Sequence, residues 1–233
     1  MTIPGDDPRA VAAFEAIHTG DVEGLERLLA EHPTLATARF TDERRHERTL
    51  LHTATDWPGH FPRGAATVAA LVAAGADTEA SFGGPHAETP LHWAASSDDL
   101  EVLDALVAAG ADVDAPGSVI DGGGPLADAV AFGQWRAARR LLEHGARANL
   151  WQAAGLGLMQ RLEAQLADGP SPDEVTSAFW CACHGGQREA AERLLTAGAD
   201  LNWAGYDDLT PLGAAERSGA TELAGWLRAQ GAR

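Results

Sequence analysis

The stretch Thr-Pro-Leu-His-Trp-Ala-Ala at residues 89–95, followed by Leu-Val-Ala-Ala-Gly-Ala-Asp at residues 106–112, decides the fold of this chain. Thr89 can cap the N-terminus of a helix through its hydroxyl group, and Pro90 costs no hydrogen bond at the first helical position. The second phrase is typical of a helix end, because Gly110 can take the left-handed conformation that terminates helices. Together the two phrases predict a pair of short helices.

Both phrases recur along the sequence, which makes them a repeat. The second phrase also ends at Asp77, and its glycines Gly75 and Gly110 are 35 residues apart. The Thr-Pro-Leu phrase recurs at residues 210–212 and, in a weaker form, at residues 49–52. A single helix pair of this kind cannot bury both of its faces, so the repeats must stack.

These phrases and their spacing closely resemble the ankyrin repeat over nearly the whole chain. The resemblance implies an all-α solenoid of about seven stacked helix-turn-helix repeats, as a single domain over residues 1–233. We expect residues 1–10 to be flexible, residues 11–48 to form an N-terminal capping repeat and residues 205–233 a C-terminal capping repeat. The first helices of the repeats are expected to begin near Val11, Leu50, Pro90, Pro125, Asn149, Ala178 and Pro211.

The repeat pattern is interrupted in several places. Residues 57–61 are an insertion between the two helices of the second repeat. Only four residues follow Gly145 before the fifth repeat, so the β-turn finger that normally links repeats is missing there, and the next finger, residues 169–178, is shortened. The finger at residues 115–124 is rich in glycine. The missing finger predicts a notch, or a sharp bend, near the fifth repeat.

Composition excludes several kinds of partner. The chain carries 34 acidic residues against 17 basic ones, all of which are Arg, for a net charge of -17. This acidity disfavours nucleic acid and anionic membrane surfaces and favours basic or neutral partners. The sequence has no apolar stretch of the ~20 residues that a membrane helix needs, and Cys181 and Cys183 diverge on a helix and should not form a disulfide. We expect a cytoplasmic monomer without a cofactor.

Tryptophan is unusually frequent for an Ala-rich helical array, with seven residues in the chain. Trp151 and Trp180 take the place of the family's His in the two repeats whose fingers are shortened, and Trp203 and Tyr206 lie on the following finger. One interpretation is that these rings fill the volume left by the missing finger. The other is that they line a small-molecule pocket at the notch.

The resemblance also implies that a protein or peptide binds to the concave face, which is formed by the fingers and the first helices. The side chains predicted to be exposed on this face, with aromatic anchors among them, form a mixed set. We therefore predict a binding site made of Asp56, Trp57, His60, Trp93, Ser96, Asp98, Asp128, Phe132, Gln152, Cys181, His184, Trp203 and Tyr206.

Catalytic and metal-binding alternatives follow from individual spacings. His52, Asp56 and His60 could share one helical face as metal ligands, although His52 occupies the structural His position and residues 58–59 should break the helix. Cys181 and His184 could pair as nucleophile and base, with Asp128 on the same surface. The alternative to a binding module is thus a small-molecule-binding protein or enzyme with a pocket lined by Trp93, Asp128, Trp151, Cys181 and His184. No phosphate-binding loop is present.

Two further features have structural explanations. His92 should bond to the backbone and to Thr89, and the pair at residues 98–99 should cap the second helix of its repeat.

We expect a concave face on which Trp93 is an exposed anchor. Replacing Trp93 by Ala would then weaken binding and leave the helices intact.

Overall fold

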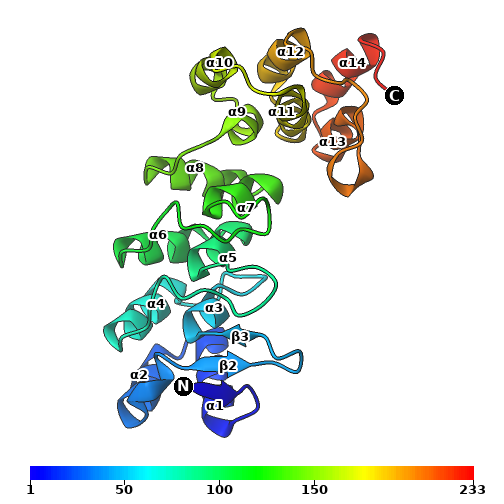
Figure 1. The fold of residues 1–233 in the computed structure, drawn as a ribbon. Coiled ribbons are helices and arrows are strands. Elements are labelled where there is room, and N and C mark those ends of the chain that lie inside the picture. Colours follow the sequence, from blue (N-terminus) through cyan, green and yellow to red (C-terminus); the bar gives the residue numbers. More distant parts are fainter. The chain divides into compact units, whose positions relative to one another are not determined.

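The structure is a computed structural model that describes residues 1–233, with fourteen α-helices and one small three-stranded sheet. The chain divides into two compact units, residues 1–146 and 147–233, which Figure 1 shows in the colours of the sequence. The boundary lies in the link that follows Gly145, where α8 has already ended and Asn149 caps α9. The link contains no strand, so the absence of a finger there is confirmed.

The first unit contains four helix pairs. Its inner helices contact one another in chain order, and so do its outer helices, which is the stacking that the repeat requires. The pairs are α1 (Pro8–Thr19) with α2 (Val22–Glu31), α3 (Leu50–Thr55) with α4 (Gly64–Ala73), α5 (Pro90–Ser96) with α6 (Leu100–Ala108), and α7 (Pro125–Ala131) with α8 (Trp135–Glu143).

Strands that precede and follow the first helix pair in the sequence form one small sheet. Strand β1 (Thr2–Pro4) pairs in parallel with β2 (Arg39–Thr41), which pairs antiparallel with β3 (Glu47–Arg48). A 3-10 turn, η1 (Pro33–Leu35), connects α2 to this sheet. The prediction of a flexible N-terminus was therefore wrong, because the backbone of residues 2–4 is paired and the Ile3 side chain is buried.

The second unit contains three helix pairs, again stacked inner on inner, with α10 also contacting α12. They are α9 (Leu150–Leu156) with α10 (Met159–Ala167), α11 (Pro172–His184) with α12 (Arg188–Thr196), and α13 (Pro211–Arg217) with α14 (Thr221–Ala229). A 3-10 turn, η2 (Tyr206–Asp208), lies in the finger before α13.

Helix α11 begins at Pro172, well before the start near Ala178 that the repeat spacing predicts. Ser171 caps it: its hydroxyl oxygen accepts the Glu174 N–H at 3.3 Å, and the Glu174 carboxylate accepts the Ser171 N–H at 2.8 Å. This reciprocal cap starts the helix early. The shortened finger is thus replaced by an added stretch of helix.

Two buried histidines fix neighbouring repeats of the first unit to each other. The Thr89 N–H donates to Nδ1 of His92 at 3.1 Å, and Nε2 of His92 lies 3.2 Å from the Gly123 carbonyl oxygen in the next finger. His52 makes the same two contacts, with Thr49 and with the Glu88 carbonyl. The structural role predicted for His92 is confirmed.

Burial lowers the pKa of both His52 and His92 to about 4, so both rings are neutral at pH 7. A neutral ring has one acceptor and one donor, which matches an N–H on one side and a carbonyl on the other.

The substitution His92→Ala should lower the free energy of unfolding by about 2–3 kcal/mol, because it leaves the buried Thr89 N–H and the Gly123 carbonyl without their partner and opens a cavity. Urea unfolding followed by circular dichroism measures the loss. His86→Ala, at an exposed position of the preceding finger, is the matched control and should change stability by less than about 0.5 kcal/mol. Equal effects of the two substitutions would contradict the role given to His92.

Candidate functional site

Trp57 is the most exposed large apolar side chain of the chain, with 81% of its surface accessible. It lies in the insertion after α3, which ends at Thr55, so the prediction that residues 58–59 lie outside the helix is confirmed. The insertion is held against the α5–α6 turn. The His60 N–H donates to Oδ2 of Asp99 at 2.6 Å, and Nε2 of His60 lies 3.0 Å from the Ser97 carbonyl oxygen.

Gly59 brings the two backbones together, since a Cβ atom at this position would lie 2.8 Å from Cβ of Ser97. Its φ of 71° also lies in the left-handed region, which favours glycine. The loop that carries Trp57 is therefore fixed at both its glycine and its histidine. The Trp57 ring is presented to solvent by a backbone that cannot easily fold back over it.

Phe132 is the second exposed aromatic side chain in this unit, at 52% accessibility. It caps the C-terminus of α7. The turn that follows it is tied to α5, because Nε2 of Gln134 donates to the Ser96 carbonyl oxygen at 2.9 Å. The Trp57 loop and the Phe132 turn thus both contact the C-terminal end of α5, Ser96–Ser97, from the repeats on either side. We call Trp57, Ser96 and Phe132 the aromatic face.

Trp93 is only partly exposed. Its ring lies 4.9 Å from the His52 ring and 5.2 Å from the Phe82 ring, and it hydrogen-bonds to the Glu88 side chain. Part of this tryptophan therefore holds the finger of residues 76–88 onto α5. Replacing Trp93 by Ala would remove these contacts and so disturb the fold as well as the surface. This differs from the expectation that the substitution leaves the helices intact.

The carboxylates predicted for the site are already engaged within the first unit. Asp56 pairs with Arg48 at 2.7 Å and keeps 38% of its side chain exposed. Asp98 accepts the Ala137 N–H at 2.7 Å, and Asp99 caps α6 by accepting the Val102 N–H at 3.3 Å. The predicted capping role of the pair is confirmed for Asp99, while Asp98 ties α8 to the preceding repeat.

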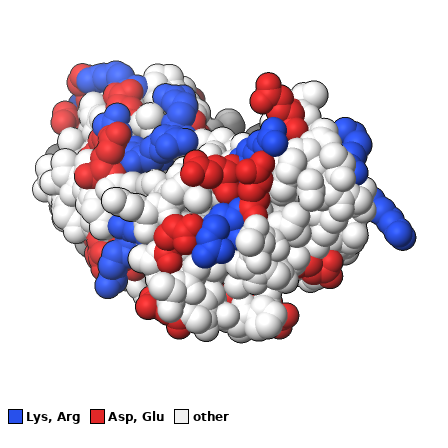
Figure 2. All heavy atoms as spheres, turned by 90° about the horizontal axis from the view of Figure 1, so that it is seen from above, with Lys and Arg blue, Asp and Glu red and all other residues white.

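Elsewhere in the structure, too, positively charged side chains lie next to negatively charged ones. On the face that Figure 2 shows, Arg side chains lie beside Asp and Glu side chains, with uncharged surface between them. Ion pairs between neighbouring repeats include Arg63–Glu23, Arg140–Asp104 and Arg193–Glu163, all at 2.7–2.8 Å. On this face no single large acidic patch stands out.

Four residues predicted to be exposed are buried, and these predictions were wrong. Asp128 is 0% exposed, and Gln152, Cys181 and His184 are each below 10%. Asp128, Gln152 and Cys181 occupy the position after the family's His, and His184 lies three residues beyond Cys181 on α11; fingers and neighbouring inner helices cover both positions in these repeats. Gln152 forms a reciprocal cap with Asn149 at 2.8 and 3.1 Å.

The predicted nucleophile and base lie inside the second unit. Cys181 and His184 belong to α11, which packs between α9 and α13. The Ser218 hydroxyl donates to the His184 carbonyl oxygen at 2.6 Å, and the His184 ring lies 5.4 Å from the Trp180 ring. Burial raises the pKa of the neighbouring Cys183 to about 12. These thiols belong to the core.

Aromatic rings in the second unit attach the last finger to α11. Trp180 donates its Nε1–H to the Leu209 carbonyl oxygen at 2.8 Å, and its ring lies 5.2 Å from that of Tyr206. Trp203 packs beside Tyr206 at 6.2 Å, and Trp151 packs partly buried against the same core. The interpretation that these rings fill core volume holds for Trp180, which is 3% exposed, and not for Tyr206, which is 39% exposed.

The three potential metal ligands of the second repeat are not brought together. Both ring nitrogens of His52 are used inside the fold, and Asp56 and His60 turn to different partners. No group of three or more His, Cys, Asp or Glu side chains in the structure is arranged to hold a metal ion. None of the helices has both the length and the apolar character to span a bilayer.

A pocket of about 620 Å³ lies in the first unit beside the small sheet, and no motif in the sequence predicts it. Its lining residues come from segments about 40 residues apart in the sequence, which only the pairing of β1 with β2 brings together. The strands have two or three residues each, too few to show an alternating pattern of polar and apolar side chains.

Comparisons with known proteins support the repeat assignment. Residues 63–152 match the family model of ankyrin repeats (three copies). Among solved structures, the human ASB11 ankyrin repeat domain matches with a TM-score of 0.55 and 20% identity, over 92% of this chain and 96% of that one. Because 394 solved chains match, the fold alone does not select a function. No curated protein matches the sequence.

Asp128 is the most deeply buried acid of the first unit. The Ser118 hydroxyl donates to its Oδ1 at 2.5 Å, while its Oδ2 has no hydrogen-bond partner. Burial raises the pKa of Asp128 to about 7, and the negative charge of Glu88 adds to this rise, against the Ser118 bond. The folded chain therefore holds a proton here that the unfolded chain releases above its ordinary pKa near 4.

Because the folded state binds more protons between pH 4 and 7, Asp128 makes stability fall as pH rises through that range. Asp128→Asn removes this charge, so its stability relative to the unmodified chain should rise by about 1–3 kcal/mol between pH 5 and pH 8. The two buried histidines act oppositely, but they are present in both proteins and cancel in the comparison. Urea titrations at the two pH values measure it; an unchanged difference would contradict the raised pKa.

Proposed function

Because the chain is an ankyrin-repeat protein, we propose that it is a non-catalytic module that binds a protein or peptide through its first unit, with Trp57 and Phe132 as the anchors. Ankyrin repeats generally mediate protein–protein interactions. Within that general role, we assign partner binding to the aromatic face, which lies at the C-terminal end of α5.

The exposure of Trp57 on a fixed loop carries the proposal. A tryptophan ring gains from leaving water, yet this ring is 81% exposed while its loop is held by Gly59 and His60. The ring makes no contribution to the core that would explain it. Aromatic side chains at such positions supply most of the energy of protein interfaces, because they bury a large area at little entropic cost.

The partner best suited to this face is a peptide with an apolar side chain next to a basic one. Trp57 and Phe132 offer apolar contact, and the Asp56 carboxylate next to Trp57 is partly exposed and paired only with Arg48. The overall charge of -17 adds attraction for a basic partner over distances up to about a Debye length.

The burial of Cys181 and Asp128 supports a non-catalytic role. An attacking thiol must reach its substrate and be deprotonated, and a general base must be within hydrogen-bond reach of the proton it removes. Cys181 is 3% exposed and Asp128 is 0% exposed. The residues on which the enzyme alternative depended are therefore used for packing.

A library of random peptides displayed on phage, selected against the whole chain, tests the proposal. Selected peptides should bind in solution, and Trp57→Ala should weaken them by more than about 2 kcal/mol, or roughly 30-fold, measured by fluorescence anisotropy. Circular dichroism should be unchanged, because the ring has no buried contacts to lose. Phe132→Ala should act in the same direction.

Tyr206→Ala, which removes the exposed aromatic ring of the second unit, is the matched control and should leave peptide affinity within about twofold. If Trp57→Ala and Phe132→Ala bind the selected peptides as tightly as the unmodified chain, the aromatic face is not the binding surface. A selection that enriches no peptide would also count against the proposal.

A further inference from the structure

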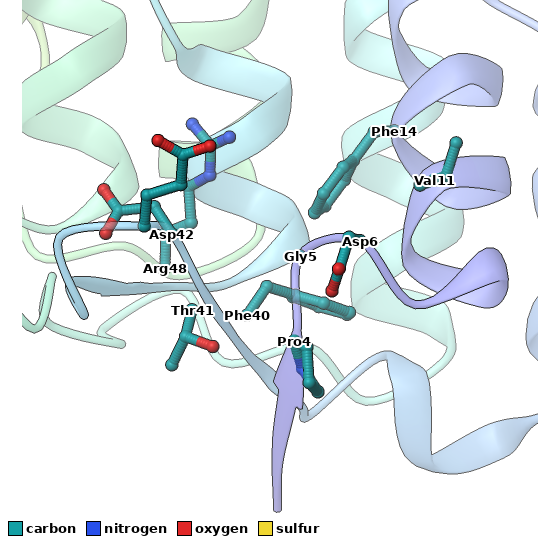
Figure 3. A pocket seen from close by; sticks show the side chains of 10 residues that line it. Pro4, Gly5, Asp6, Val11, Phe14, Phe40, Thr41, Asp42 and Arg48 are labelled. Atoms are coloured by element: carbon teal, nitrogen blue, oxygen red, sulfur yellow. The ribbon is translucent and has the colours of Figure 1, made fainter.

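The pocket beside the N-terminal sheet has the size of a ligand site. Its volume of about 620 Å³ falls within the range of roughly 300–1,000 Å³ that is usual for small-molecule sites. One side is formed by α1 and the turn before it, the other by β2, β3 and the turn between them. Figure 3 shows Phe14 and Asp6 on the first side and Asp42 and Arg48 on the second.

The floor and one wall of the pocket are apolar. The rings of Phe14 and Phe40 meet edge to face with their centres 5.3 Å apart, and Val11 extends the wall along α1. Phe40 is almost fully buried beneath, at 1% exposure. The Phe14 ring points into the pocket (Figure 3). An aliphatic chain placed here would gain contact with the Phe14 ring and with Val11, while Phe40 supports the Phe14 ring from beneath.

The walls are held in place by backbone contacts. The Gly5 N–H donates to the Thr41 carbonyl oxygen at 2.9 Å, and a Cβ at Gly5 would lie only 2.9 Å from that oxygen. The opposite turn is closed by Asp42, whose Oδ1 accepts the N–H groups of Arg44 and His46 at 2.8 Å each. The pocket is therefore a preformed feature of the sheet.

Acidic groups outnumber basic ones around the pocket. Asp6, Asp42 and Glu43 line it, against Arg48 alone. Arg48 is already occupied: it pairs with Asp56 at 2.7 Å, and its guanidinium carbon lies 5.6 Å from the centre of the Phe14 ring. Asp6 and Glu43 are exposed, and their carboxylates are available to a ligand at the rim.

We propose that this pocket binds an organic cation, a guanidinium or ammonium group carried on an apolar chain. The acidic rim attracts the cation and repels an anion, and Phe14, which already holds the Arg48 guanidinium beside its ring, supplies an apolar wall for the rest of the ligand. The apolar chain then lies on Phe14 and Val11. This pocket shares no residue with the aromatic face. A result against the proposed peptide site would therefore not count against cation binding in the pocket, and the reverse also holds.

Butylguanidinium and its neutral analogue butylurea, which differ mainly in charge, are the first probes. Titrated into the whole chain and followed by NMR chemical shifts of the Gly5 and Thr41 amides, butylguanidinium should bind at least about fivefold more tightly than butylurea. Equal affinities, or no shift of these amides at about 20 mM butylguanidinium, would overturn the proposal.

Substitutions at the pocket localise the binding. Asp6→Asn and Glu43→Gln should each weaken butylguanidinium by at least about twofold, and Phe14→Leu, which keeps an apolar wall and removes the ring, should do the same. The matched control is Glu31→Gln on α2, an exposed carboxylate outside the pocket, which should leave affinity unchanged. An equal loss in this control would mean that the cation responds only to overall charge, against the proposal.

The same chemistry is found in free amines and in arginine side chains of peptides. Agmatine and a Gly-Arg-Gly peptide with blocked ends distinguish these sources, since the peptide adds backbone that only an open pocket accommodates. Tighter binding of agmatine identifies a small-molecule site, and tighter binding of the peptide identifies an arginine-recognition site. Failure of both to compete with butylguanidinium would place the probe outside the pocket and refute the assignment.

Discussion

The hydrogen bonds of a neutral imidazole hold each early repeat to the next. In the second and third repeats the ring accepts the N–H of its own helix-capping threonine and donates to a carbonyl of the following finger, Glu88 for His52 and Gly123 for His92. A protonated ring would have no acceptor for the threonine N–H. Burial, by lowering the pKa of both rings to about 4, keeps them in the form that this geometry needs.

Later repeats place other groups at the same position, and each replacement changes how the finger is attached. Trp180 has an indole N–H in place of an imidazole and donates it to Leu209, so one hydrogen bond to the finger is kept. Ala127 has none. There the glycine-rich finger is held by His92 from the preceding repeat and by the contact of Ser118 with Asp128 from its own. That finger is consequently held by a neutral imidazole and by a carboxyl group whose burial favours its protonated form, and the contributions of these two groups to stability change with pH in opposite directions.

The sequence predicted the repeat well because its signals are local. Thr89, Pro90 and Gly110 act within one turn of the helices that they begin or end, and spacing then sets the order of the stack. Exposure is not local. Asp128 and Cys181 were placed on a surface by counting from the repeat's His position, but a finger or a neighbouring helix covers them. The pocket was missed for the same reason, since it depends on pairing between Thr2–Pro4 and Arg39–Thr41.

Trp57 and Trp180 show what a residue type alone leaves undecided. Both are tryptophans at irregular points of the repeat, yet one is 81% and the other 3% exposed. Trp180 sits on an inner helix, where finger and neighbours close over it. Trp57 sits in an insertion whose backbone is fixed to Ser97 and Asp99, and the ring that this backbone carries lies in solvent. The attached loop thus carries an apolar surface that lies in water and adds nothing to the core, and burial of that surface by a partner is the favourable step on which the proposed binding function rests.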